Sequence, residues 1–252
     1  MERARPAVSS PPLLVRNALS LIVRALTRRL AWRAPSTPVQ APSHDAPRPR
    51  GDRNMNPRGI GFLELLAEDY RTHEHKLLEP GFWAIAVHRF GNLRMDVRPK
   101  LLRAPLSRAY LLLSTAVNWT WGIDLPYTVR LGRRVRIWHH GGIVLGARSI
   151  GDDVHIRQNT TFGVRSRQAL ESIPIIGDRV DIAAGACVVG AVTVGDDCVI
   201  GPNSVVLRDV PPGSTVMGAP ARLATFGAGD APGAGATTRT DDRGRGSVGP
   251  PG

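Results

Sequence analysis

The stretch 176–206, IGDRVDIAAGACVVGAVTVGDDCVIGPNSVV, decides the fold, because an aliphatic residue stands at every sixth position of it. Neither an α-helix nor an ordinary β-sandwich has a period of six. The same period runs upstream in two shorter blocks, with a one-residue slip between them and a longer excursion before residue 176. The periodic positions are Leu131, Ile137, Ile143, Ile150, Ile156, Phe162, Ile176, Ile182, Val188, Val194, Ile200 and Val206.

The residues around each periodic position predict a three-sided coil. The position two residues earlier is also apolar or small, so each repeat has two inward residues separated by an outward one, which makes a very short strand. Glycine often follows the periodic residue, as at Gly151 and Gly177, where we expect a tight corner that needs a residue without a Cβ. If three strands close one coil, residues eighteen apart stack, as Ile176 would on Val194, about 4.8 Å away along the axis.

The composition suits this architecture and argues against nucleic-acid binding. The 252 residues include 27 glycines and 21 prolines, with only 5% aromatic residues, which is typical of a turn-rich chain. The formal net charge is +12, but residues 1–58 contain eleven arginines and three acidic residues, so the remaining body is only mildly basic. Cys187 and Cys198 match neither a disulfide framework nor a metal-binding spacing, and we expect reduced thiols in a cytoplasmic protein.

The pattern divides the chain into four segments. Residues 1–58 form a basic, Pro-rich extension that we expect to be disordered or amphipathic, and residues 59–122 form a helical domain. Residues 123–226 form the repeat domain, and residues 227–252 a disordered tail rich in Gly, Ala and Pro.

The N-terminal extension contains an apolar run, about residues 13–33, that four arginines interrupt, so it cannot cross a bilayer. Three interpretations stay open: a membrane-surface helix, a transit-like segment, or an upstream extension of the reading frame with Met55 as the start. Whether residues 1–54 belong to the mature protein stays open with them.

Two stretches of the sequence resemble the serine acetyltransferase family of hexapeptide-repeat acyltransferases. They are 122–163, GIDLPYTVRLGRRVRIWHHGGIVLGARSIGDDVHIRQNTTFG, and the exit 205–222, VVLRDVPPGSTVMGAPAR, within a similarity that covers about residues 60–224. The resemblance implies a mainly β fold, a left-handed parallel β-helix preceded by a small α-helical domain. It also implies acetyl-CoA as co-substrate in a groove between neighbouring prisms, and a homotrimer or dimer of trimers.

The resemblance also implies a catalytic pair. The family's general base aligns with His139, four residues before Ile143, and its supporting carboxylate with Asp124. An alcohol is a poor nucleophile near neutral pH, so an imidazole must take its proton as it attacks the thioester. A carboxylate on the other ring nitrogen fixes the tautomer and stabilises the imidazolium. His140 is the adjacent competitor, and on a strand only one of the two can face the substrate.

For the cofactor, alignment to the family points to Gly163, Ala184 and Pro202 along the groove and to Arg222 as a phosphate partner. Arg165 and Arg167, in the excursion, are the second choice for the phosphates.

Three acceptor-site positions depart from the family pattern. Trp138 stands where the family has an Asp before the base, and Ser172 and Ile173 replace an Arg-His pair. We therefore treat Trp138, Ser172 and Ile173 as the substrate-binding candidates. An aromatic residue beside the base would also suit a sugar ring.

The leading functional hypothesis is a serine O-acetyltransferase that makes O-acetyl-L-serine for cysteine biosynthesis. An O-acetyltransferase of a sugar or glycan intermediate is the alternative, and a non-catalytic solenoid scaffold is a lesser one. A metalloenzyme would need three convergent histidines, and His139, His140 and His155 do not supply a convincing set. We expect no metal site.

Overall fold

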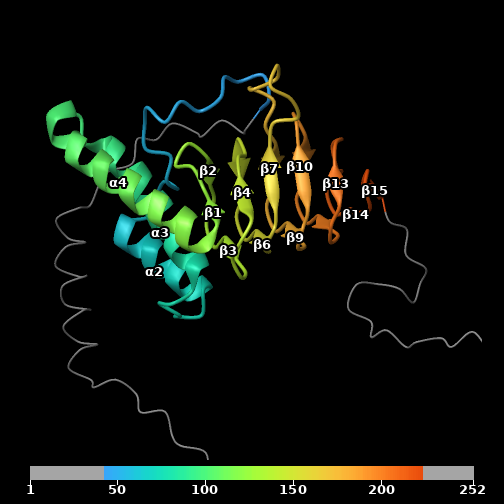
Figure 1. Cartoon of the computed structure of the whole chain (residues 1–252), viewed down its shortest axis with the longest axis horizontal. Coiled ribbons are helices and arrows are strands. Elements are labelled where there is room, and N and C mark those ends of the chain that lie inside the picture. The colour runs from blue at the N-terminus through green and yellow to red at the C-terminus, as the bar shows by residue number, and fades with distance from the viewer. Residues whose placement is uncertain (1–42, 224–252) are drawn as a thin grey trace, which may run out of the picture.

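The computed structural model describes residues 43–223, so the apolar run at residues 13–33 and the tail at 227–252 lie outside the described residues. A small group of helices lies at one end of a long β-helix (Figure 1). The helices are α2 (Phe62–Thr72), α3 (Pro80–Leu93), the short 3₁₀ helix η1 (Arg94–Asp96) and α4 (Lys100–Trp121). Pro80 starts α3 at a position where its missing N–H costs nothing, and Gly122, with φ 63°, ends α4.

The β-helix consists of three sheets that form the three sides of a prism. In the order of pairing, sheet A contains β1 (Ile123–Asp124), β4 (Ile143–Leu145), β7 (Thr161–Gly163), β10 (Cys187–Val189) and β13 (Val205–Val206). Sheet B contains β11 (Thr193–Val194), β8 (Ile175–Ile176), β5 (Ser149–Ile150) and β2 (Arg130–Leu131). Sheet C contains β15 (Arg222–Leu223), β14 (Thr215–Met217), β12 (Val199–Ile200), β9 (Asp181–Ile182), β6 (His155–Ile156) and β3 (Arg136–Ile137).

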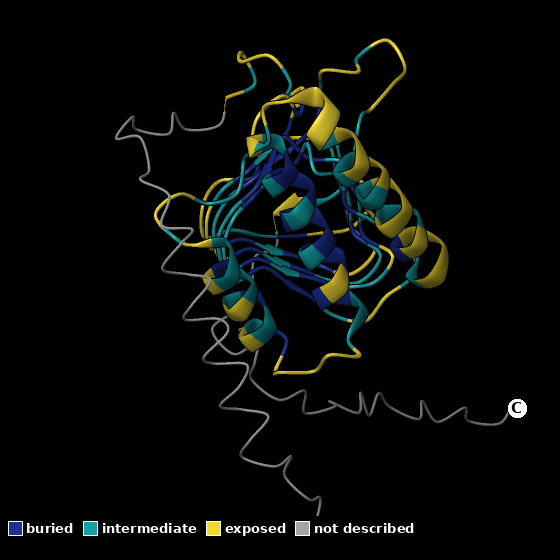
Figure 2. Cartoon of the chain, turned by 90° about the vertical axis from the view of Figure 1, so that its left-hand side faces the viewer, coloured by how far each residue is buried: buried dark blue, intermediate teal, exposed yellow. Residues whose placement is uncertain are grey.

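The six-residue period sets the register of these sheets. Residues eighteen apart are paired neighbours in parallel strands, for instance Ile176 with Val194, which confirms the predicted stacking. Ile182 with Ile200 and Val188 with Val206 follow the same rule. The inward residues form one continuous apolar core, and Figure 2 shows this buried interior enclosed by the strands. Burial of this column is the main stabilising contribution to the prism.

The glycines after the periodic residues have a different physical reason from the one we expected. Gly151 and Gly177 are not among the described residues with positive φ, so left-handed corner geometry does not require them. Instead, a Cβ at Gly151 would collide with the backbone of Gly177 in the next coil. Left-handed conformations belong to residues such as Asp153 and Asn203. The glycines therefore allow close stacking of successive coils.

Helix α3 closes the end of the prism where the first coil has no earlier coil to pair with. Figure 2, which views this end, shows the buried side of the helix lying across the opening. Side chains of α3 donate hydrogen bonds to carbonyl groups of that coil, and so cover an edge that would otherwise be exposed. These bonds run from His88 Nε2 to Val129 O (2.9 Å), from Arg89 Nη1 to Leu131 O (2.9 Å), from Arg89 Nη2 to Gly132 O (2.6 Å), and from Asn92 Nδ2 to Tyr127 O (3.0 Å).

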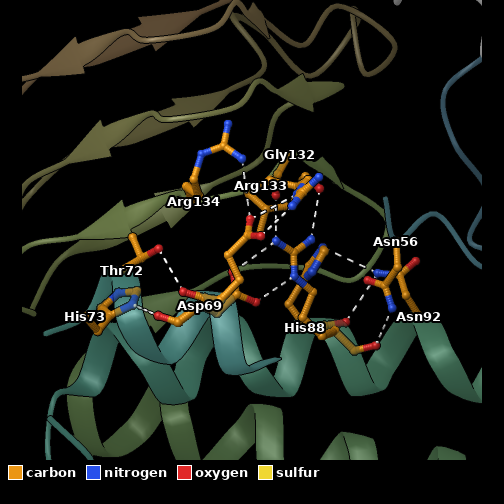
Figure 3. Close-up of polar contacts among 12 residues, drawn as sticks. Asn56, Asp69, Thr72, His73, His88, Asn92, Gly132, Arg133 and Arg134 are labelled. Atoms are coloured by element: carbon orange, nitrogen blue, oxygen red, sulfur yellow. Dashed lines mark hydrogen bonds and ion pairs between the residues drawn. The ribbon is translucent and has the colours of Figure 1, made fainter. Parts of the chain in front are cut away.

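A buried ion pair fixes this cap to α2. Both Arg89 and Asp69 are fully buried, with 3.0 Å between Nε and Oδ2 (Figure 3). At the rim of the same interface, Glu68 of α2 accepts a hydrogen bond from Arg133 Nε at 3.0 Å. Arg134 lies 3.5 Å from the same carboxylate. The helical domain is thus held rigidly against the first coil, which places the connection between α2 and α3 beside β3.

Residues 43–59 form a strap that runs over the prism toward the helices (Figure 1). Its residues 43–58 belong to the extension that we expected to be disordered or amphipathic, and here they have specific partners. The strap touches the excursion loop 164–174 between β7 and β8, and it also reaches α3. Its bonds join His44 Nε2 with Thr193 Oγ1 (3.1 Å), Arg48 N with Glu171 Oε2 (3.1 Å), Arg148 Nη1 with Ala46 O, and Met55 N with Asn92 Oδ1 (3.0 Å).

Candidate active site

His139 lies at the corner where the chain leaves β3 and turns toward β4. Its φ of 62° is left-handed, and it is exposed. In the later coils the left-handed residue of this corner is the third after the inward isoleucine, as at Asn159, whereas His139 is the second after Ile137. The next residues are tied to α4 by a hydrogen bond from Gly141 N to Trp121 O at 2.9 Å. The first corner therefore differs from the repeating pattern at the residue expected to act as base.

His139 lines a hollow of about 590 Å³ between the first coil and the connection from α2 to α3. The side of the prism contributes Arg136, Trp138 and His139, and the connection contributes Lys76, Leu77, Leu78 and Glu79. His140 is also exposed but does not line this hollow. Of the two neighbouring histidines, His139 is the one that faces a site.

Arg136 organises the wall of this hollow. Its side chain is 9% exposed, and Nη2 lies 2.8 Å from Glu74 Oε1 and 3.7 Å from Glu79 Oε1. Nη1 donates to Thr72 O at 3.0 Å. The guanidinium lies over the indole of Trp138, 3.5 Å from the ring centroid. Arg136 thereby joins the two parts of the molecule that form the hollow.

Three polar atoms of residues that line the hollow are buried without a hydrogen-bond partner among the described residues. They are two donors, the indole Nε1 of Trp138 and Nε of Arg136, and one acceptor, Oε2 of Glu79. Buried polar atoms nearly always have a partner, because an unpaired one is costly. Such atoms beside a candidate base indicate where a polar ligand could bind.

Asp124 lies in β1, on the side of sheet A that faces α4. It is half-buried, and this burial raises the pKa of its carboxyl group. It lines a second hollow, between α4 and β1, with Tyr110 and Trp119 among the other lining residues. Among the described residues, the structure has no hydrogen bond between Asp124 and His139. Two backbone hydrogen bonds, from Gly141 N to Trp121 O and from Ile143 N to Gly122 O, nevertheless hold the His139 corner next to β1.

The residues expected at the cofactor occupy more than one part of the prism. Ala184 and Pro202 follow β9 and β12 at successive corners between sheets C and A, the same edge as His139, and Asn203 N donates to Ala184 O at 2.9 Å. Gly163 lies on the other side of sheet A, at the end of β7, where an added Cβ would have no neighbour within 4 Å. Arg222 is exposed in β15, at the far end of sheet C. One chain does not gather these four residues at one point.

Ser172 and Ile173 lie in the excursion loop, between sheets A and B, and so at a different edge from His139. Ile173 is only 2% exposed. Neither lines the hollow that contains His139. Of the three substrate-binding candidates, Trp138 is the one found beside His139 within the chain.

Sequence reasoning missed Arg136 and Glu79 as parts of the site. Arg136 stands at an outward position of a strand, where an arginine is an ordinary surface residue. Glu79 directly precedes the Pro80-Gly81 break, and it is the N-cap residue of α3 without a capping hydrogen bond. The absence of a capping hydrogen bond from Glu79 marks it as a residue with another role, but this absence can be seen only in the folded structure and not in the sequence.

Within residues 43–223, no cluster of three or more His, Cys, Asp or Glu residues could hold a metal ion. No helix in this part of the chain is long and apolar enough to span a membrane.

Comparison with known proteins provides independent support for the fold. The chain is 37% identical to the serine acetyltransferase of Helicobacter pylori over 150 residues, which is 59% of this chain and 84% of that protein. The structure of the Neisseria gonorrhoeae serine acetyltransferase in complex with serine matches with a TM-score of 0.54 at 27% identity, covering 65% of this chain and 69% of that one. A serine acetyltransferase in complex with CoA matches with a TM-score of 0.52 at 27% identity, covering 65% and 69%. No protein-family model matches the chain. The mainly β fold, a left-handed β-helix with a small α-helical domain, is thus confirmed.

Proposed function

Since this chain belongs to the serine acetyltransferase family, a group of acetyl-CoA-dependent acyltransferases, we propose that it transfers an acetyl group from acetyl-CoA to L-serine with His139 as general base. The observation that carries the proposal is the place of His139, at an irregular left-handed corner that opens into a hollow lined by both charged and apolar side chains. The product, O-acetyl-L-serine, would enter cysteine biosynthesis.

The proposed reaction needs one proton carrier and no redox partner. His139 takes the proton from the serine hydroxyl as its oxygen attacks the thioester carbonyl carbon. When the tetrahedral intermediate collapses, the carbon–sulfur bond breaks, and the imidazolium returns the proton to the departing CoA thiolate. Gly122 O accepts one of the hydrogen bonds that anchor the His139 corner, and Asp124 follows it by two residues. Asp124 is proposed to stabilise the imidazolium.

Two arrangements of the site follow as proposals. Ala184 and Pro202 lie on the His139 edge, which favours this edge as one wall of the acetyl-CoA groove. Four other candidate residues do not lie at that edge within one chain: Gly163, Arg222, Ser172 and Ile173. We propose that the corresponding residues of a neighbouring subunit in a homotrimer lie close to the His139 edge. Light scattering of the purified protein measures this, and a monomeric active enzyme would contradict it. The two free cysteines favour a reducing, cytoplasmic location.

The sugar alternative loses part of its support. It rested on Trp138 as a stacking surface, and the Arg136 guanidinium covers one face of that ring.

The test is an acceptor panel with the full chain, acetyl-CoA, and L-serine, L-homoserine or nucleotide sugars, followed by CoA thiol release and product mass. We expect release with serine. His139→Ala should lower kcat by about 10²- to 10⁴-fold, and His140→Ala serves as the control that keeps activity. Release with a nucleotide sugar alone would overturn the serine assignment, and full activity in His139→Ala would overturn the mechanism.

A further inference from the structure

The carboxylate of Glu79 is the one charged group lining the His139 hollow that has no hydrogen-bonded counter-charge among the described residues. The other two charged lining groups are engaged, because Lys76 Nζ lies 2.6 Å from Glu74 Oε2 and Arg136 Nη2 lies 2.8 Å from Glu74 Oε1. Glu79 Oε1 is 3.7 Å from Arg136 Nη2, which is beyond hydrogen-bond distance. Its Oε2 is buried and unpaired.

The surroundings keep this carboxylate in place. Glu79 is 15% exposed and directly precedes α3, whose packing on the first coil leaves the backbone little freedom. A Cβ on the nearby Gly81, for instance, would collide with Ile137 O. Glu79 lines the hollow together with Trp138 and His139.

A buried carboxylate with a free oxygen favours a cationic hydrogen-bond donor over a neutral hydroxyl, because the ion pair gains most where water is excluded. We propose that Glu79 binds the ammonium group of the acceptor, so that this hollow selects small hydroxyl compounds that carry a primary amine. The unpaired indole N–H of Trp138 is the complementary donor for the acceptor's carboxylate. The inference rests on the proposed function and assigns its acceptor-recognition residue.

The test compares Glu79→Gln with Glu74→Gln in the full-length protein. Both changes remove one carboxylate charge near Arg136, but Glu74 is 48% exposed and does not line the hollow. Glu79→Gln should raise the KM for L-serine by about 10- to 100-fold, the loss of one charged hydrogen bond. It should leave the KM for acetyl-CoA unchanged. Glu74→Gln should change both by less than about threefold. Equal effects in the two variants would overturn the inference.

Acceptor analogues keep the test decisive if Glu79→Gln does not fold. Wild-type protein should use L-serine with a kcat/KM at least about tenfold above that for 3-hydroxypropionate, which lacks the ammonium group. Equal use of the two would refute the role of Glu79 while the acetyltransferase activity stands. Transfer to an amino sugar but not to serine would refute the serine assignment and leave the ammonium site intact. Transfer only to uncharged sugars would refute both.

Discussion

The guanidinium of Arg136 and the indole of Trp138 are stacked, with 3.5 Å between the guanidinium carbon and the ring centroid. The stack joins the α2–α3 connection to the first coil, because the same guanidinium pairs with Glu74 and reaches Thr72 O. Stacking of this kind is strong where the cation is shielded from water, and Arg136 is 9% exposed.

Arg136→Met should therefore destabilise the protein. The variant keeps an unbranched apolar side chain but leaves Thr72 O without its donor and Glu79 without a nearby cation. We expect the free energy of unfolding to fall by about 1–3 kcal/mol, measured by urea denaturation. Arg157→Met is the matched control, because Arg157 and its partner Asp181 are 35% and 43% exposed. It should cost less than about 1 kcal/mol, and equal losses would show that the buried contacts of Arg136 add no more stability than an exposed ion pair.

Asp124→Asn should separate stability from activity. Burial raises the pKa of the Asp124 carboxyl, so the folded protein favours the protonated, neutral form of this side chain. The protonated carboxyl contributes its full stability below the pKa of Asp124 in the unfolded chain, and this contribution is lost as pH rises through the pKa in the folded protein. At pH 7 the charged side chain is thus a cost to folding, and the amide removes it. We expect a melting temperature at pH 7 equal to or above that of the wild type. The rate kcat should fall by at least about tenfold.

Asp153→Asn supplies the opposite case. The hydrogen bond from Arg134 lowers the pKa of Asp153, so its contribution is present above the unfolded pKa and is lost as pH falls. This variant should be less stable than wild type at pH 7 and fully active. An Asp124→Asn variant that behaved in the same way would contradict the assignment.

His88 should make the protein sensitive to acid. Burial lowers its pKa to about 3, and its Nε2 hydrogen donates to Val129 O. Since the unfolded chain takes up a proton near pH 6.5, stability is full above that pH. It then declines by about 1.4 kcal/mol for each pH unit down to the folded value. His88→Gln keeps a donor and should flatten the slope between pH 6.5 and 4.5 in urea unfolding. An unchanged, wild-type slope in His88→Gln would contradict this role of His88.

The sequence predicted the core well, because a period of six leaves no freedom over which side chain points inward. Ile182, Ile200 and Val188 could be placed without structural information, since shifting the register would expose the whole column. The hollow could not be predicted in this way. It depends on contacts such as Arg136 with Glu74, which are far apart in the chain and exist only once α3 has docked on the first coil.

The prediction for the glycines that follow the periodic residues was right in one respect and wrong in another. Their places in the repeat were right, but the reason was wrong, since a single coil does not reveal how close the next coil will lie.

If glycines are needed where successive coils stack closely, alanine substitution should lower the free energy of unfolding at one glycine and leave it almost unchanged at another. Gly151→Ala should lower the free energy of unfolding by about 1–3 kcal/mol, because its Cβ would collide with Gly177 in the next coil. Gly163→Ala, with no neighbour within 4 Å of its Cβ, should change it by less than about 0.5 kcal/mol. If Gly163 lines the cofactor groove, the same variant should raise the KM for acetyl-CoA. Similar stability of the two variants would refute the explanation.

Removal of the strap should loosen the excursion loop. A chain that begins at Met55 lacks Arg48, and so loses the bond from Arg48 N to Glu171 Oε2 and the bond from Arg48 Nη1 to Leu170 O. Two lost hydrogen bonds of about 1 kcal/mol each should increase the open population of the loop by at least about tenfold. Trypsin should then cut at Arg165 or Arg167 correspondingly faster. A chain that begins at Ser43 retains both bonds and is the control, and equal cleavage of the two would mean that the strap does not restrain the loop.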